Sequence, residues 1–133
     1  MTAPIQSLML IDDNEADTFL CRLMIEEAGL ADNLLVFNLA EDALAYLRDN
    51  PRPIDAILLD IRMPRMSGFE FIEAALAEFG SAFAKVVIVM LTTSLDINDK
   101  MKAEQFGVVK GYFEKPLSQA QLETIAAMVS GST

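Results

Sequence analysis

The sequence has 133 residues, of which 53% are hydrophobic, and a formal net charge of −10 at pH 7. A chain of this length and apolar content can bury the core of one domain, and its negative charge argues against direct binding of nucleic-acid phosphates. It contains no histidine and one cysteine, Cys21, which excludes an internal disulfide and argues against a zinc or iron–sulfur site.

Short apolar runs alternate with helical patterns along the chain. The first run, residues 7–11, predicts a buried strand that stops at Asp12 and Asp13, and Asn14 then caps a helix that ends at Gly29. Helical spacing predicts the inner face of this helix: Leu20, Cys21, Met24, Ile25 and Ala28. Phe19 and Leu23 lie beside that stripe and widen its apolar face.

The same patterns continue to the end of the chain. They predict strands at 34–37, 57–60, 86–91 and 111–113 and helices at 40–48, 68–79, 98–106 and 118–129, with a loop at 50–53. A capping box of Ser118 and Gln121 marks the start of the last helix.

Five alternations of strand and helix predict an α/β fold with one parallel sheet and helices on both faces. Right-handed crossovers leave few topologies, and one of them is the flavodoxin-like (βα)5 order 2-1-3-4-5. We expect a single domain over residues 1–133, with its core at about 6–130. The start has no signal-peptide layout and no apolar run approaches a membrane span, so we expect a cytoplasmic protein.

The strand at 57–60 is the most informative stretch. Three aliphatic residues lead to Asp60, Pro64 prevents the strand from continuing, and Gly68 supplies conformational freedom for the turn into the next helix. Asp60 therefore lies at the carboxyl end of a buried strand, where open α/β sheets place their functional residues. Taken alone, it is equally compatible with a helix cap or turn aspartate.

Other polar residues end neighbouring strands. In the order 2-1-3-4-5, Asp12, Asp13 and Asp60 meet at one edge of the sheet, and Thr92 and Lys115 reach the same edge. Three clustered carboxylates repel one another, by about 4 kcal/mol for two at about 4 Å and an effective dielectric constant of 20. A hard divalent cation relieves this repulsion, and few carboxylates with room for water suit Mg²⁺. A phosphoryl group can then lie between the metal, the Lys115 ammonium and the Thr92 hydroxyl, with a carboxylate as nucleophile.

These positions resemble a known family. The chain resembles the receiver domain of two-component response regulators at four places: Asp12-Asp13, the segment Asp60-x-x-Met63-Pro64-x-Met66-Ser67-Gly68, Thr92, and Lys115-Pro116. The resemblance spans nearly the whole chain.

The resemblance implies a role for each position. Asp60 would accept a phosphoryl group, and Asp12, Asp13, Asp60 and the backbone carbonyl of Arg62 would hold Mg²⁺. Lys115 and Thr92 would bind the phosphoryl group, and the Lys115–Pro116 peptide bond would be cis. Tyr112 would be the switch aromatic that turns inward when Thr92 moves, although a core tyrosine is the alternative interpretation. The protein would catalyse its own phosphorylation and slow dephosphorylation, and we do not expect a metabolic enzyme.

The resemblance also implies partners. A histidine on a sensor kinase or on a phosphotransfer protein would donate the phosphoryl group, because this chain has no histidine. The chain stops soon after its fifth helix, so we expect no output domain, and a downstream protein or onward phosphotransfer would receive the signal. The face formed by the fourth helix, fifth strand and fifth helix would contact that partner or form a homodimer. Docking of the donor at Phe19 and Leu23 is a further hypothesis.

Residues beside the site set the lifetime of the phosphoryl group in such domains. They are Arg62, Thr93 and Ser94. The Arg62 cation either shields an acyl phosphate from water or lies along the surface.

The residues argue against two alternatives and leave a third open. A dehalogenase-type phosphatase needs a second acid two residues after the nucleophile, where this chain has Arg62, and a flavodoxin needs a phosphate-cradling loop where Asp12 and Asp13 stand. A pseudo-receiver would bind partners without being phosphorylated. It usually lacks an acid or the lysine, and neither is missing here.

Overall fold

A computed structural model of the chain describes residues 3–50, 53–93 and 96–131. Five parallel strands form one sheet in the order β2-β1-β3-β4-β5, which confirms the predicted topology. The strands are β1 (Ile5–Ile11), β2 (Ala31–Phe37), β3 (Ala56–Asp60), β4 (Val87–Thr92) and β5 (Val109–Glu114).

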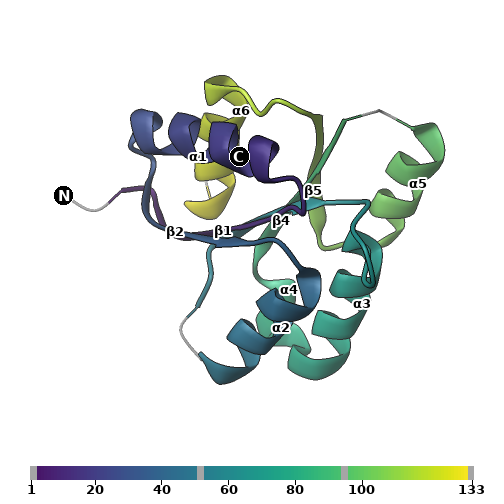
Figure 1. Cartoon of the computed structure of the whole chain (residues 1–133). Helices are drawn as coiled ribbons and strands as arrows, with labels where there is room; N and C mark the ends of the chain where they lie inside the picture. The colour runs from purple at the N-terminus through teal and green to yellow at the C-terminus, as the bar shows by residue number, and fades with distance from the viewer. Residues whose placement is uncertain (1–2, 51–52, 94–95, 132–133) are drawn as a thin grey trace.

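Helices cover both faces of the sheet (Figure 1). One face carries α1 (Glu15–Ala28) and α6 (Gln119–Val129). The other carries α2 (Ala40–Asp49), α3 (Gly68–Phe79), the short α4 (Ser81–Ala84) and α5 (Ile97–Gln105). The sequence did not predict α4, because four residues are too few to show helical periodicity.

The two layers of the core follow from the alternation of side chains along the strands. In β1, Met9 and Ile11 pack toward α2 and α3, whereas Leu8 and Leu10 pack toward α1 and α6. The three central strands are covered on both sides, which explains why they read as uninterrupted apolar runs.

Two sequence predictions need correction. The strand expected at 34–37 begins at Ala31, because β2 is an edge strand whose backbone pairs with β1 even where its side chains are polar. Leu20, predicted to face inward, is 61% exposed, and buried Thr18 lies on the inner face with Ile25. The Thr18 hydroxyl donates to the Glu15 carbonyl, so a polar residue is tolerated there.

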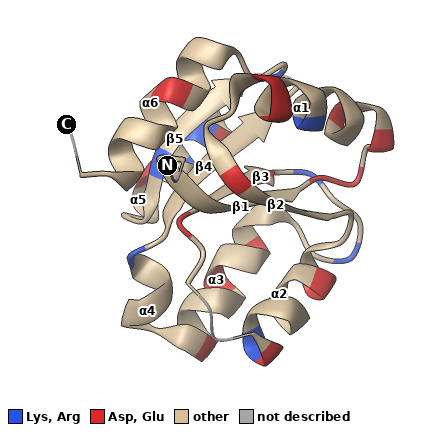
Figure 2. Cartoon of the chain, turned by 90° about the vertical axis from the view of Figure 1, so that its left-hand side faces the viewer, with Lys and Arg blue, Asp and Glu red and all other residues tan. Residues whose placement is uncertain are grey.

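Acidic residues lie on helices of both layers (Figure 2). Figure 2 shows acidic residues on α1, α2, α3 and α6. Within the described residues, no helix combines the length and apolar character needed to cross a membrane. Some predictions fall outside the described residues. They concern the two ends of the predicted domain (1–2 and 132–133), part of the predicted loop (51–52), and Ser94 beside the site.

Gly68 is required by close packing and not by an unusual turn. It is the buried first residue of α3, and its amide donates to the Ile61 carbonyl at 2.8 Å. A Cβ at this position would collide with the backbone oxygen of Asp60 and would lie 3.0 Å from the Met90 Cε. The predicted importance of Gly68 stands, but its physical reason is the close approach of α3 to the end of β3.

We expect Gly68→Ala to lower the free energy of unfolding by about 2 kcal/mol, because backbone atoms of β3 cannot move away as a flexible side chain could. Urea denaturation measures the loss. Gly107→Ala is the matched control, since a Cβ there meets no atom within 4 Å, and it should change stability by no more than about 0.5 kcal/mol. Equal stability of the two variants would contradict the packing argument.

Candidate functional site

The register of the sheet brings the strand-end acids together. Ile11 of β1 pairs with Leu59 of β3, so Asp12 follows β1 at the level where Asp60 ends β3. Asp60 in turn pairs with Leu91 of β4, and Thr92 comes next. Parallel strands present their carboxyl ends at the same edge, so the residues meet without any special loop.

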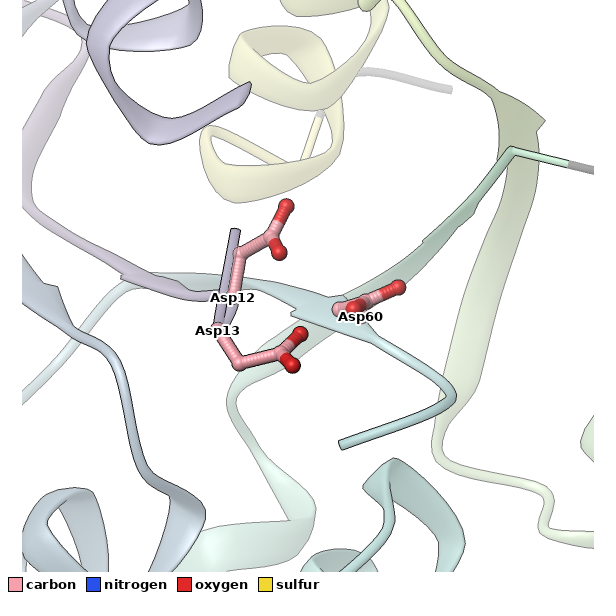
Figure 3. Close-up of side chains that lie close together, drawn as sticks. All are labelled: Asp12, Asp13 and Asp60. Atoms are coloured by element: carbon pink, nitrogen blue, oxygen red, sulfur yellow. The ribbon is translucent and has the colours of Figure 1, made fainter. Parts of the chain in front are cut away.

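Three carboxylates converge at this edge. Figure 3 shows Asp12 and Asp13 extending from the end of β1 beside Asp60 at the end of β3. One carboxylate oxygen from each lies within 4.8 Å of the others. Asp12 and Asp60 are buried, whereas Asp13 is exposed. Oxygen ligands in this arrangement can converge on one small divalent cation, with an open side left for water or a further oxygen ligand.

Lys115 lies among carboxylates. Its ammonium donates to Asp12 Oδ2 at 2.6 Å and to Asp17 Oδ2 at 3.1 Å, and lies 3.4 Å from Asp60 Oδ1. Its backbone N–H donates to the Thr92 carbonyl at 2.7 Å, which places the loop after β5 against the end of β4. The following Lys115–Pro116 peptide bond is cis.

The ionisation of Asp60 reflects this crowding. Burial, followed by the charge of Asp12, raises its pKa to about 7, although Lys115 acts in the opposite direction. Burial alone would lower the pKa of Lys115, but its hydrogen bond to Asp12 and the charge of Asp60 raise it. One ammonium therefore does not neutralise the site in the absence of a metal ion.

The other predicted residues surround the same cavity. A hollow of about 550 Å³ is lined by Asp60, Thr92, Lys115 and Arg62. Thr92 is buried, and its contact with a phosphoryl group stays a prediction. The role of the Arg62 carbonyl as a metal ligand stays a prediction.

Tyr112 lies on β5 opposite Met90, and its ring packs partly buried against the core. Its hydroxyl oxygen is buried and has no hydrogen-bond partner of normal geometry among the described residues. Burial raises the pKa of this phenol, and the charges of Asp99 and Asp96 add to the rise, whereas the Asp96 backbone opposes it. Its role as a switch stays a prediction.

Sequence reasoning missed two acids. Asp17 is not among the predicted site residues, yet it pairs with Lys115 from the first turn of α1. Its position, directly after the strand-end acids and on the turn that faces them, was a usable signal. Asp99, which accepts a hydrogen bond from Arg62 at 2.6 Å, gave no such signal, since 37 residues separate the partners.

Comparison with known proteins points to one family. Residues 8–127 match the family described as response regulator receiver domain. The chain is 28% identical over 118 residues to "Sensor histidine kinase CheAY" of Helicobacter pylori, which covers 89% of this chain and 14% of that protein. It is 32% identical over 103 residues to "Hybrid signal transduction histidine kinase D" of Dictyostelium discoideum, covering 75% and 7%. The chain thus spans only a small part of these curated relatives.

Solved structures agree. A two-component response regulator from Cytophaga hutchinsonii superimposes with a TM-score of 0.90 at 28% identity, covering 96% of this chain and 98% of that one. A response regulator receiver protein from Dyadobacter fermentans gives a TM-score of 0.82 at 28% identity, covering 93% and 97%. The chemotaxis protein CheY4 of Vibrio cholerae gives 0.77 at 25% identity, covering 94% and 98%.

The raised pKa of Asp60 predicts a pH-dependent cost to stability. Between its ordinary value of 3.8 and about 7 the folded state holds a proton that the unfolded state releases, so stability falls as the pH rises through this range. Asp60→Asn removes the cost. In EDTA, its stability advantage over the wild type should be larger at pH 8 than at pH 5 by on the order of 2 kcal/mol.

Urea unfolding at the two pH values measures this difference. The control is Asp42→Asn on α2, whose carboxylate is exposed. An Asp60→Asn effect that varies with pH no more than the Asp42→Asn effect would show that Asp60 ionises normally.

Proposed function

Since the chain belongs to the family of response regulator receiver domains, we propose that Asp60 accepts a phosphoryl group from a phosphohistidine in a Mg²⁺-dependent reaction. The donor would be a sensor histidine kinase or a histidine phosphotransfer protein. The observation that carries the proposal is the position of the Asp60 carboxylate, which lies beside two further acids and 3.4 Å from the Lys115 ammonium.

The transfer exchanges one bond to phosphorus for another. A carboxylate oxygen of Asp60 forms a bond to phosphorus while the phosphorus–nitrogen bond of the phosphohistidine breaks, and the imidazole nitrogen keeps the electron pair and takes up a proton from solvent. Asp12, Asp13, Asp60 and the Arg62 carbonyl would hold Mg²⁺, which supplies charge neutralisation for the carboxylates and phosphoryl oxygens. Because phosphohistidine is already activated, positioning and charge account for most of the catalysis.

The protein side chains then hold the product. The Lys115 ammonium would leave Asp12 or Asp17 for one phosphoryl oxygen, and the Thr92 hydroxyl would donate to another. Movement of Thr92 would allow Tyr112 to turn inward, and this change would alter the surface that a downstream protein reads. Slow hydrolysis of the aspartyl phosphate would end the signal. A phosphorylation-independent pseudo-receiver is the less favoured alternative, because all the acids and the lysine are present and close together.

A groove beside α1 supports a docking site for the phosphodonor. Phe19, Leu20 and Leu23 are 61%, 61% and 41% exposed on this helix. A mainly apolar hollow of about 610 Å³ runs from Leu20 and Met24 to Lys115. A helix that lays apolar residues here and carries a phosphohistidine would bring it to Asp60. We place this phosphotransfer in the cytoplasm. We also propose that the face formed by α5, β5 and α6 can form a homodimer.

Incubation with acetyl phosphate and Mg²⁺ tests the proposed chemistry. The intact mass of the wild type should increase by one phosphoryl group, whereas Asp60→Asn should stay unmodified because it has no nucleophilic carboxylate. The Asp42→Asn variant should be modified like the wild type. Addition of EDTA should prevent the reaction. A wild type that remains unmodified would favour the pseudo-receiver.

Phe19→Ala tests the docking site. Because Phe19 is mostly exposed, we expect the variant to fold and to take up phosphate from acetyl phosphate at the wild-type rate. Transfer from a phosphorylated kinase or phosphotransfer protein should slow about fivefold, as expected for loss of an aromatic interface anchor. Met101→Ala, equally apolar and 55% exposed on α5, is the control. Unaltered protein-to-protein transfer in Phe19→Ala would remove the docking hypothesis.

A further inference from the structure

The side chain of Arg62 connects the site to α5. Arg62 stands two residues after Asp60, and its guanidinium lies 2.6 Å from Asp99 Oδ2 on the first turns of α5. The Arg62 side chain is 73% exposed and therefore free of core packing, whereas that of Asp99 is only 15% exposed. The carboxylate is thus fixed on its helix, and the arginine is the partner that can move.

Arg62 also borders two hollows. One is the cavity that contains Asp60 and Lys115. The other, of about 520 Å³, lies between the loop after β3 and α5 and is lined by Asp99, Lys102 and Phe69. Arg62 therefore stands between the two hollows, and its exposed side chain is not held by core packing in either.

Helix α5 is attached to the rest of the domain by few contacts. Ala103 is its one fully buried residue, and Ile97 and Met101 are 66% and 55% exposed. Lys102 lies 4.8 Å over the Phe69 ring of α3, Phe106 at the C-terminal end of α5 stacks on the same ring, and α5 also contacts β5. Because α5 buries little apolar surface, one ion pair contributes a sizeable part of its stability against local opening.

We infer that the Arg62–Asp99 ion pair is a latch that holds α5 in the unphosphorylated protein and opens when Arg62 exchanges Asp99 for the phosphoryl group on Asp60. This inference rests on the proposed function, because the exchange needs a phosphoryl group at Asp60.

Charge and geometry favour the exchange. A phosphoryl group carries about −1.5 to −2 charges and three acceptor oxygens, and arginine can bind it through two parallel hydrogen bonds. Asp99 offers a single charge. Loss of Arg62 then leaves the mostly buried Asp99 carboxylate without its cation, which weakens the attachment of α5. By linkage, whatever weakens the latch also favours phosphorylation.

Two variants break the same ion pair with different consequences. Asp99→Asn removes the latch but leaves Arg62 able to contact the phosphoryl group, and Arg62→Ala removes both interactions. In both unphosphorylated variants, hydrogen exchange of the α5 amides should accelerate about two- to fivefold, the range for a largely exposed ion pair. Phosphorylation of Asp99→Asn by acetyl phosphate and Mg²⁺ should accelerate by a similar factor.

The phosphorylated proteins separate the two roles of Arg62. The half-time of phosphorylated Arg62→Ala should shorten about two- to fivefold, whereas that of Asp99→Asn should equal or exceed the wild-type value. The control is Glu41→Gln, which breaks the Arg65–Glu41 ion pair of 3.2 Å from the same loop to α2. It should change neither α5 exchange nor the half-time.

Three results would overturn the latch alone, provided that the wild type is phosphorylated. The first is hydrogen exchange of the α5 amides in Asp99→Asn at the wild-type rate. The second is an unchanged half-time of phosphorylated Arg62→Ala, and the third is a shortened half-time of phosphorylated Asp99→Asn. A wild type that acetyl phosphate does not modify would instead overturn the proposed function, and with it the exchange of partners.

Discussion

The charge imbalance around Lys115 governs the structure of the site. One ammonium lies within 3.4 Å of Asp12, Asp17 and Asp60, and Asp13 adds a fourth carboxylate nearby. Two carboxylates at about 4 Å repel by about 4 kcal/mol at an effective dielectric constant of 20, and the single charge of Lys115 faces four carboxylates. Burial of Asp60 and then the charge of Asp12 raise its pKa to about 7, although Lys115 acts in the opposite direction. The fold holds these carboxylates together in spite of their repulsion, and such a cluster can bind a cation.

The sheet makes this crowding unavoidable. Asp12 and Asp60 each follow a strand buried on both faces, and the register of β1 against β3 leaves them side by side. Gly68 brings α3 up against the backbone of Asp60, so the loop after β3 has little room to draw the carboxylate away. The apolar packing of the central strands is therefore what holds like charges together.

Sequence reasoning succeeded where one local signal decided the outcome. Apolar runs located the central strands, and the order of the strands brought Asp12, Asp13, Asp60, Thr92 and Lys115 to one edge. It failed where the outcome depended on packing or on distant pairing. Leu20 matches a helical stripe, but the buried face of α1 runs through Thr18 and Ile25 and leaves Leu20 exposed. The partners of the Arg62 and Lys115 side chains depend on helix positions that no sequence pattern encodes.

The acidic mouth also bears on the choice of phosphodonor. Asp13, Asp17 and Asp96 line the cavity around Asp60, and Arg62 and Lys115 are the cations among the described residues that line it. Under the proposed function, these charges repel a small anionic donor as well as a phosphorylated protein. A protein donor has a compensation that a small anion lacks, because the groove along α1 offers apolar surface at Leu20 and Met24 directly beside Lys115. Charge repulsion at the cavity and apolar contact along α1 therefore together favour a protein donor over a small anionic one.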